Sequence, residues 1–456
     1  MKFVIITHTK HKLSDNYIYA YEPYVREMNL WVKNVDEVKI VAPFSMEDIN
    51  SIESEYQFNN QKNKQIATSQ APRNDESERH SEQREAISSN EQIATSQAPR
   101  NDELIKLIEI PAFDITSLKN GAIAILKIPK ICIRLYKAMK WADHIHLRCP
   151  GNIGLLGCFV QILFPNKPKT IKYAGNWDPN SKQPFSYKLQ KWILNNTFLM
   201  RNAKVLVYGA WPNQSKNIIP FFTASYSEKE YNSEQPGAIP SNEQIATSQA
   251  PRNDNVVKRH SEQGEAISLN KQITTSTNHS DNKINFIYVG GLTSGKQPLL
   301  CVKVVHQLKL KGLNITLAIY GEGAERAEIE YYIKTNNLMD IVTLHGNASK
   351  DQVKRAYKKA HFLLFISKSE GWPKVVAEAM FWGCVPITSK VSCVPWMLKG
   401  GKRGLLVDSD MNKIVSAIEK LWKDKKRYRQ MSIKAKKWSR QYTLETFEKE
   451  IKKILQ

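Results

Sequence analysis

The sequence predicts an α/β protein with two domains, each built on a doubly wound parallel sheet. Three observations support this prediction: the length of 456 residues, the alternation of short β-rich runs with helical stretches, and the recurrence of that alternation in both halves of the chain. A chain of this length exceeds one ordinary core, and such alternation favours parallel sheets covered by helices. Ligands of such sheets bind beyond the carboxyl ends of the strands, so we expect two domains that face one another across a cleft.

The first half holds six expected strands, and helical stretches at 24–35 and 187–198 lie between them. The N-terminal run is read as a strand, because no small-residue cleavage site follows it. The uncharged run from Cys149 to Asn166 begins with Pro and Gly, so it is read as a buried helix rather than a membrane span. The expected strands are 2–8, 36–43, 104–110, 143–149, 169–175 and 204–210 in this half, and 284–291, 315–323, 341–347, 361–367, 384–389 and 403–408 in the second.

Two polar segments differ in composition from the rest of the chain. The peptide QIATSQAPRND occurs at 65–75, at 92–102 and again at 244–254. The copies lie in two blocks, roughly 61–103 and 241–283, which are nearly free of aromatic residues and lack helical or strand periodicity. Such segments bury too little surface to offset their ordering entropy. We therefore predict two flexible, disordered insertions and interpret them as translated copies of one repetitive DNA element in tolerant loops.

The formal net charge of +22 predicts attraction to a polyanion: nucleic acid, an anionic membrane or a phosphorylated substrate. No helix-turn-helix, zinc-finger or RNA-binding signature accompanies the charge, so nucleic acid is not expected. The six cysteines stand in apolar surroundings without a C-x-x-C pair, which indicates free thiols in a reducing compartment and neither a disulfide framework nor a zinc site. A cytoplasmic location is therefore expected.

Two glutamates bracket a Gly-Trp-Pro turn in the segment ISKSEGWPKVVAEAMFWGCVPI, 366–387. Glu370 follows an expected strand, Pro373 suits the first position of a helix and Gly383 suits its end, while Glu378 lies at the margin of the helix's apolar face. Carboxylate oxygens accept hydrogen bonds from the vicinal hydroxyls of a ribose or a hexose, and the N–H groups at a helix start suit a diphosphate. Two glutamates at this spacing also occur by chance in a chain rich in acids. From the residues alone, both interpretations stay open.

The second half resembles the donor domain of the family 4 glycosyltransferases, retaining enzymes of the GT-B fold with two Rossmann-like domains. The E-x7-E pair, YVGGLTSGKQP, YGEG and HGN carry this resemblance, in the family's order, between Asn285 and Asp408. It implies that Glu378 binds the ribose, that the catalytic Glu370 binds the transferred sugar and that Lys296 pairs with the diphosphate. The further implied donor-binding positions are Gly371 and Trp372, through their main chain, and Gly290, Gly291, Gly321 and Gly323 in the glycine turns. The family often has arginine at the position of Gly291, so part of its usual positive charge is missing here.

Other interpretations of these positions exist. A glycine turn such as Gly321 to Gly323 often only ends a strand, and a lone lysine such as Lys296 is typically solvated. The DSD at Asp408 to Asp410 imitates a D-x-D metal signature, but it precedes the helical stretch 411–422, so a helix cap is expected. We predict no metal and no cofactor, because a UDP- or GDP-linked sugar would be a substrate.

In the first half, the resemblance places a histidine where DHIHLRCP has Arg148. Arginine cannot act as a base at neutral pH, but its guanidinium can hold a diphosphate as the bond to the sugar breaks, while the phosphate takes the acceptor's proton. His146 on the same face of the strand is a second candidate, with a packed strand histidine as the alternative. Asn152 and the amides of Gly151 and Gly154 would add to this anion site.

Acceptor contacts are predicted at Asn176 and Trp177 in the segment YAGNWDP, and in THTKHK, 7–12. A turn-capping asparagine and a buried tryptophan are the alternatives. The stretch 122–141, with an expected bend near Pro129, places basic residues among apolar ones. Such a surface suits peripheral association with an anionic membrane, with a solvated face as the alternative.

These observations predict an acceptor domain at 1–240, an insertion near the interdomain linker at 241–283, a donor domain at 284–440 and a terminal helix at 441–456 that crosses back to the first domain. The expected function is that of a metal-independent, retaining, hexosyltransferase-type enzyme that moves a sugar from a nucleotide-diphosphate sugar to a glycan or lipid-linked acceptor in cell-surface polysaccharide synthesis. The alternative is a nucleotide-sugar epimerase, or a non-catalytic sugar-nucleotide binder, of the same fold.

Overall fold

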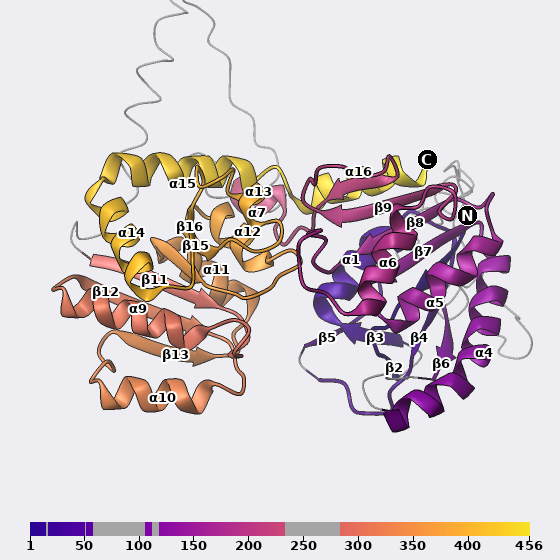
Figure 1. Ribbon diagram of the computed structural model, residues 1–456, viewed down its shortest axis with the longest axis horizontal. Coiled ribbons are helices and arrows are strands. Elements are labelled where there is room, and N and C mark those ends of the chain that lie inside the picture. The colour runs from indigo at the N-terminus through magenta and orange to yellow at the C-terminus, as the bar shows by residue number, and fades with distance from the viewer. Residues whose placement is uncertain (15–16, 51, 58–104, 112–117, 233–282) are drawn as a thin grey trace, which may run out of the picture. The chain divides into compact units, whose positions relative to one another are not determined.

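The computed structural model describes residues 1–14, 17–50, 52–57, 105–111, 118–232 and 283–456, with the backbone alone at 118–125 (Figure 1). The two predicted insertions lie outside the described residues, apart from Lys283. The chain divides into two compact units, which are Met1–Phe222 together with Phe447–Gln456, and Thr223–Thr446. Within the described ranges, no helix combines the length and the apolar character needed to cross a bilayer.

A seven-stranded parallel sheet forms the centre of the first unit, in the order β10-β9-β8-β7-β1-β4-β6. Its central strands are buried along nearly their whole length, as expected of a sheet covered on both faces. The six strands predicted for this half are present, and β10, which includes Pro220, was not predicted. The strands are β1 (Lys2–Ile6), β4 (Glu37–Pro43), β6 (Ile105–Ile110), β7 (His144–Cys149), β8 (Lys169–Tyr173), β9 (Ala203–Tyr208) and β10 (Ile218–Phe221).

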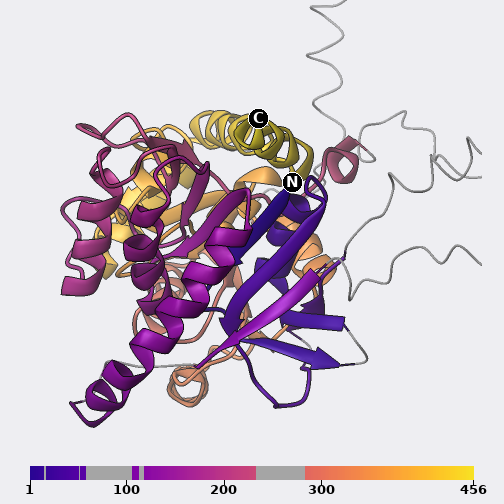
Figure 2. The ribbon, with the colours of Figure 1, turned by 90° about the vertical axis from the view of Figure 1, so that its right-hand side faces the viewer.

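Helices cover both faces of this sheet. Side chains alternate between the faces of a strand, and in β1 Val4 joins the core beneath α4, whereas Phe3 stacks on Trp31 of α1 with ring centroids 6.1 Å apart. Figure 2 shows α4 lying along the sheet, and this helix continues through Pro129. The helices are α1 (Glu22–Val32), α4 (Leu118–Trp141), α5 (Asn152–Val160) with the 3-10 turn η1 (Gln161–Leu163), and α6 (Phe185–Asn195).

The first unit also contains a small antiparallel sheet and part of the C-terminal helix. A small antiparallel sheet, β2-β3-β5, was not predicted, because its short strands mix charged and apolar residues. The last helix, α16 (Leu444–Leu455), supplies Phe447, whose ring packs against Phe221 and Phe222 at 5.3 and 5.5 Å. The small-sheet strands are β2 (His11–Ser14), β3 (Tyr17–Tyr21) and β5 (Glu53–Glu55).

The second unit contains a six-stranded parallel sheet in the order β13-β12-β11-β14-β15-β16. All six predicted strands of this half are present. They were recognisable because β-branched and aromatic residues dominate each run and a glycine or a polar residue follows it. The strands are β11 (Lys283–Val289), β12 (Asn314–Tyr320), β13 (Val342–Gly346), β14 (Phe362–Phe365), β15 (Val385–Ser389) and β16 (Leu405–Val407).

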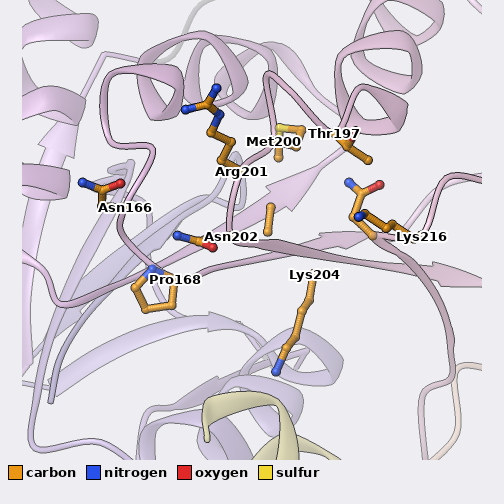
Figure 3. Close-up of a pocket in the computed structure, with 10 residues that line it drawn as sticks. Asn166, Pro168, Thr197, Met200, Arg201, Asn202, Lys204 and Lys216 are labelled. Atoms are coloured by element: carbon orange, nitrogen blue, oxygen red, sulfur yellow. The ribbon is translucent and has the colours of Figure 1, made fainter.

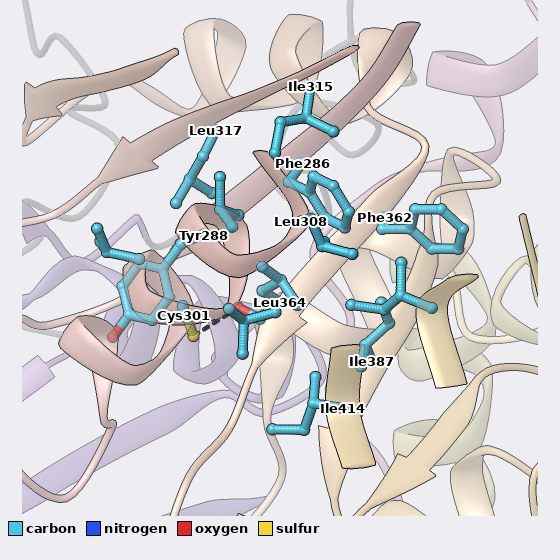
Figure 4. Packing of buried hydrophobic residues seen from close by; sticks show 14 of the residues in the cluster. Phe286, Tyr288, Cys301, Leu308, Ile315, Leu317, Phe362, Leu364, Ile387 and Ile414 are labelled. Carbon is cyan, nitrogen blue, oxygen red and sulfur yellow. Dashed lines mark hydrogen bonds between the residues drawn. The ribbon is translucent and has the colours of Figure 1, made fainter. Parts of the chain in front are cut away.

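The core of this unit lies between the sheet and helices α9, α10 and α14. Figure 4 shows strand residues such as Phe286 and Leu317 packed against Leu308 of α9 and Ile414 of α14. Helices α11, α12 and α15 contact the sheet or one another elsewhere. The helices are α7 (Glu228–Asn232), α9 (Pro298–Leu310), α10 (Arg326–Thr335), α11 (Lys350–Lys359), α12 (Lys374–Phe381), α13 (Val394–Met397), α14 (Met411–Lys423) and α15 (Lys425–Ser439).

Candidate functional site

The strand order of the second sheet reverses between β11 and β14. The chain continues from β11 to β12 and β13 on one side, and from β14 to β15 and β16 on the other. The loops that leave the carboxyl ends of β11 and β14 therefore diverge, and this is the position at which doubly wound sheets bind their ligands. Gly290 and Gly291 follow β11, and Glu370, Gly371 and Trp372 follow β14. The fold thus brings the predicted donor residues to one edge of one sheet.

Lys296 and Glu370 form an ion pair between these two loops. The Glu370 side chain is nearly buried and that of Lys296 is partly exposed, with its Nζ 5.1 Å from the centre of the Phe365 ring. The loops are also joined by their backbones, because the amide of Lys368 donates to the carbonyl of Gly295 at 2.8 Å. The residues predicted to hold the diphosphate and the sugar therefore lie in direct contact.

Backbone N–H groups add to the positive character of this edge. Within the described residues, the amides of Gly291, Glu370 and Gly371 donate to no protein acceptor. The amides of Glu370 and Gly371 precede α12, which begins at Lys374 with Pro373 as its N-cap, one residue later than predicted, whereas Gly291 lies in the loop after β11. Free amides at a helix start favour an anion. Lys296 adds a full charge to the same edge.

The glycine turn after β12 packs backbone against backbone on the loop after β11. A β-carbon at Gly321 would lie 2.0 Å from the carbonyl oxygen of Gly290, and one at Gly323 would lie 2.4 Å from that of Leu292. Both glycines also have positive φ, +137° and +158°. By contrast, a β-carbon at Gly291 would meet nothing closer than 3.9 Å. Glycine is thus required at 321 and 323 to shape the β11 loop, whereas at 291 it leaves open space.

Glu378 lies on α12 and is half-buried. Its Oε1 accepts a hydrogen bond of 2.6 Å from the hydroxyl of Ser225, at the start of the second unit. Sequence reasoning missed Ser225, because no motif or spacing links it to the E-x7-E segment. The carboxylate predicted to bind the ribose therefore already accepts a hydrogen bond from a hydroxyl group of the same unit.

The side chain of Trp372 belongs to an aromatic cluster with Trp396, Trp438 and Tyr442, at centroid distances of 6.0 to 6.4 Å. Because this side chain is buried, contacts of residue 372 with a ligand would involve its main chain, as the resemblance implies. The carbonyl of Gly371 accepts a hydrogen bond of 2.9 Å from the Ser392 hydroxyl. The turn that carries Glu370 is thereby fixed to the protein on its other side.

The DSD segment caps a helix, as predicted. Oδ1 of Asp410 accepts a hydrogen bond of 3.0 Å from the amide of Lys413 in the first turn of α14, and Asp408 pairs with Lys390 at 3.1 Å. Elsewhere in the described part of the chain, no three His, Cys, Asp or Glu side chains gather closely enough to hold a metal ion.

In the first unit, strand order reverses between β1 and β7, and Arg148 lies at the end of β7. Its Nη1 lies 2.5 Å from Oε1 of Glu27 on α1, and both side chains are nearly buried. The guanidinium also lies 5.2 Å from the centre of the Tyr24 ring. Burial alone would lower the pKa of Arg148, but Glu27, Tyr208 and Tyr24 together raise it above its ordinary value. The predicted phosphate-binding arginine is thus held in place by a carboxylate that sequence reasoning did not identify.

His8 follows β1 and was not singled out from the sequence, where it was only one member of THTKHK. Its ring is packed closely to Gly151, so that a β-carbon there would lie 3.0 Å from Nδ1. The pKa of His8 is lowered by partial burial and by the charge of Arg148. Asn152 is the first residue of α5. His8, Arg148 and Asn152 therefore share the carboxyl edge of the first sheet.

The remaining candidates of the first unit take part in packing. His146 is buried against Trp31 at 4.6 Å, and burial holds its pKa well below the ordinary value, which confirms the packed-histidine alternative. Oδ1 of Asn176 accepts a hydrogen bond of 2.9 Å from the amide of Asp178, so this side chain caps a turn. Trp177 is buried, and its indole donates to Gln214 at 2.7 Å. Asn176 thus caps a turn and Trp177 is buried, which are the two alternatives to acceptor binding.

The family model that matches this chain covers mainly the second unit. Residues 270–438 match the family model of "Glycosyl transferases group 1". Over 127 residues the chain is 31% identical to an α-1,4-N-acetyl-D-galactosaminyltransferase of Campylobacter jejuni that acts on a diphosphoundecaprenol-linked sugar, with 27% of this chain and 34% of that protein covered. An uncharacterized glycosyltransferase of Methanocaldococcus jannaschii is 24% identical over 188 residues, 41% of this chain and 51% of that protein. The chain thus matches about a third to a half of the length of these curated relatives.

Solved structures resemble the whole chain. Anabaena HepE in complex with UDP and glucose has a TM-score of 0.55 at 12% identity, with 100% of this chain and 99% of that chain covered. The sucrose-phosphate synthase of Thermosynechococcus elongatus has a TM-score of 0.56 at 16% identity, with 100% of this chain and 98% of that chain covered. A glycosyltransferase of Rickettsia africae has a TM-score of 0.56 at 10% identity, with the same coverage of both chains. The predicted fold class is thereby confirmed as two α/β units with parallel sheets, matching GT-B glycosyltransferases.

Proposed function

We propose that the protein is a retaining glycosyltransferase that moves a hexosyl residue from a nucleotide-diphosphate sugar to a glycan or lipid-linked acceptor. The observation that carries this proposal is the meeting of Lys296 and Glu370 at the β11/β14 edge, beside three backbone amides that donate to no acceptor in the described ranges. This edge lies within the residues that match the group 1 family model. A cation and amides suit a diphosphate, and a carboxylate suits sugar hydroxyls.

The chemistry assigned to this edge is charge stabilisation of the leaving group. The bond between the sugar's anomeric carbon and the phosphate oxygen breaks, and its electron pair goes to the nucleoside diphosphate. Lys296 and the amides near Glu370 stabilise that charge. The acceptor oxygen bonds to the anomeric carbon on the same face and gives its proton to the departing phosphate, so no protein base is required. Donors preorganised in this way act most strongly where charge develops in the transition state.

Glu370 and Glu378 orient the donor in this proposal. On binding, Glu370 exchanges part of its pairing with Lys296 for hydrogen bonds from sugar hydroxyls, and Glu378 exchanges the Ser225 hydroxyl for ribose hydroxyls. Arg148 is assigned to a phosphate oxygen, for which the ion pair through Nη1 to Glu27 leaves its other N–H groups available. No metal ion is included, because Lys296 and the amides supply the positive charge.

The lipid-linked acceptor is supported by the Campylobacter relative and by one surface of the first unit. Helices α4, α5 and α6 contain no Asp or Glu. Large apolar side chains on and beside α6 are exposed, with Phe185 at 80%, Trp192 at 60% and Phe198 at 70%. Aromatic and basic groups on one surface suit the interface of an anionic membrane. We therefore assign peripheral membrane association to this surface, in cell-surface polysaccharide synthesis.

The test is an assay of nucleotide release from UDP- and GDP-sugars with a lipid-linked acceptor mixture, with and without EDTA. We expect UDP or GDP release that depends on the acceptor, persists in EDTA and is lost in Glu370→Gln. Analysis of the product's anomeric configuration checks retention. Turnover without an acceptor, giving an epimerised sugar nucleotide, would favour the epimerase instead, and the absence of turnover with any sugar nucleotide would refute the proposal.

A further inference from the structure

The first unit has a cavity of about 470 Å³ near the amino ends of β8, β9 and β10. The predicted site residues of this unit lie at the opposite, carboxyl edge of the same parallel sheet. Figure 3 shows Asn166 and Asn202 on one side of the cavity, Lys216 on the other, and Arg201 on the loop that leads into β9. The ten lining residues include three cations, three asparagines and a threonine, and no acid: Asn166, Pro168, Thr197, Met200, Arg201, Asn202, Ala203, Lys204, Lys216 and Asn217.

No acidic residue in the described part of the chain pairs with the cations around this cavity. Among the described residues, no carboxylate lies within ion-pair distance of Arg201, Lys204 or Lys216. The guanidinium of Arg201 stacks on Phe198, with Cζ 4.7 Å from the ring centre, which leaves its in-plane N–H groups available. Lys204 extends toward α16 and donates to the carbonyl of Ile454 at 2.9 Å, so its ammonium is solvated by a neutral group. With respect to the described residues, the positive charge of this cavity is therefore uncompensated.

Two buried basic groups lie near these cations, and the pKa of one of them, His144, reports the positive charge around it. Lys169, at the start of β8, is almost completely buried, and its Nζ donates at 2.7 Å to the backbone carbonyl of Arg201. Burial lowers its pKa to about 8. The pKa of buried His144 is lowered to about 4, by burial and by the charges of Lys204 and Lys169. Positive groups gathered without counter-charge repel one another, and a bound anion relieves that repulsion.

We propose that this cavity is a binding site for a phosphate-bearing anion, which is separate from the donor site and does not rest on the proposed transferase activity. Arg201 contacts the phosphate through its planar N–H groups, and Lys216 supplies the opposing charge. Asn166, Asn202 and Thr197 provide polar contacts for the rest of the ligand. The volume lies within the range of small-molecule sites, about 300–1,000 Å³, so it accommodates a diphosphate or a phosphorylated sugar.

The phosphate has two possible sources, a soluble phosphate compound or the headgroup of an anionic lipid. The second source is considered because Phe198, the stacking partner of Arg201, is exposed. Both sources use the same chemistry at Arg201 and Lys216. Two probes distinguish them: sodium pyrophosphate in solution, and phosphatidylcholine vesicles that contain phosphatidic acid.

The experiment measures binding of each probe to the full chain at constant ionic strength, by calorimetry for pyrophosphate and by flotation for vesicles. Arg201→Gln and Lys216→Gln each remove one cavity cation. Lys334→Gln is the matched control, because Lys334 is an exposed lysine of α10, outside both the cavity lining and the surface assigned to the membrane, and its loss changes the net charge equally. We expect saturable binding of at least one probe, at least tenfold weaker in each cavity variant and unchanged in the control.

Pyrophosphate binding with this dependence identifies a soluble ligand, and vesicle binding alone with the same dependence identifies a lipid headgroup. The proposal is overturned if neither probe binds saturably, or if the cavity variants bind as well as Lys334→Gln. It is also overturned if Lys296→Gln abolishes pyrophosphate binding while Arg201→Gln retains it, since the ligand would then occupy the second unit's site. Thermal unfolding of each variant without ligand checks that it remains folded.

Discussion

The hydroxyl of Ser225 donates a 2.6 Å hydrogen bond to Oε1 of Glu378, the carboxylate assigned to the ribose hydroxyls. Ser225 presents the same functional group that a ribose would, so it competes with the nucleotide for this oxygen. Binding therefore exchanges one hydrogen bond for others of the same kind, and the net gain is smaller than the contacts alone suggest.

Replacement of Glu378 by Ala is expected to weaken UDP or GDP binding about tenfold or more, because hydrogen bonds to a charged group contribute about 1.5–3 kcal/mol. Ser225→Ala is expected to leave the affinity unchanged or to raise it slightly, since it removes the competitor. Titration calorimetry measures both, with Glu328→Ala, an exposed glutamate on α10, as the control. Equal affinity in wild type and Glu378→Ala would remove this residue from the site.

Lys296→Gln separates diphosphate binding from nucleoside binding. We expect the affinity for UDP to fall about tenfold, the effect of losing one charge-assisted contact, while the affinity for uridine stays the same. Lys334→Gln on α10 makes the same charge change at an exposed position and serves as the control. A parallel loss for uridine would mean that Lys296 supports the structure of the loop rather than the diphosphate.

Gly323→Ala tests the backbone contact between the β12 turn and the β11 loop. Its β-carbon would lie 2.4 Å from the carbonyl oxygen of Leu292, so the loop must move. We expect a loss of about 1–3 kcal/mol in the free energy of unfolding, as for other overpacked sites, together with weaker nucleotide binding. Gly295→Ala, where a β-carbon meets nothing within 4 Å, is expected to be neutral. Urea unfolding of both variants checks the difference.

Acid is expected to destabilise the first unit through its buried histidines. Burial lowers the pKa of His11 and of His144 to about 4 in the folded state, from 6.5. The unfolded chain therefore binds more protons between these values, and stability falls as the pH falls from 6.5 toward 4. Each histidine accounts for roughly 2 kcal/mol between pH 7.5 and pH 5. Urea unfolding at both pH values should show a smaller loss for His144→Gln; an equal loss would argue against this assignment.

Most of both parallel sheets was predictable from the sequence, because a buried parallel strand leaves a continuous apolar run that needs no tertiary context. The run at 361–367 is an example: β14 is buried at every position. The small β2-β3-β5 sheet left no such signal, since its three strands are short and partly exposed. Strand β10 was missed for a similar reason, as it has only four residues, one of them Pro220.

The candidate site was predictable where spacing along the chain fixes position in space. Glu370 and Glu378 lie on one turn-helix segment, so their placement followed from local structure. By contrast, Glu27 contacts Arg148 and Ser225 contacts Glu378, although each pair is separated by more than a hundred positions in the sequence. No periodicity reports such a contact. The same reason left His8 unidentified, because only the folded sheet brings it beside Arg148.

The C-terminal residues 447–456 belong with the first unit, although residues 223–446 of the second unit separate them from it in the chain. During synthesis the seven-stranded sheet is therefore translated long before Phe447, which covers Phe221 and Phe222, has left the ribosome. The nascent first unit must persist with this aromatic surface bare while the entire second unit is made. Chaperone binding to ribosome-bound chains that end before residue 447 would be the signature of that delay.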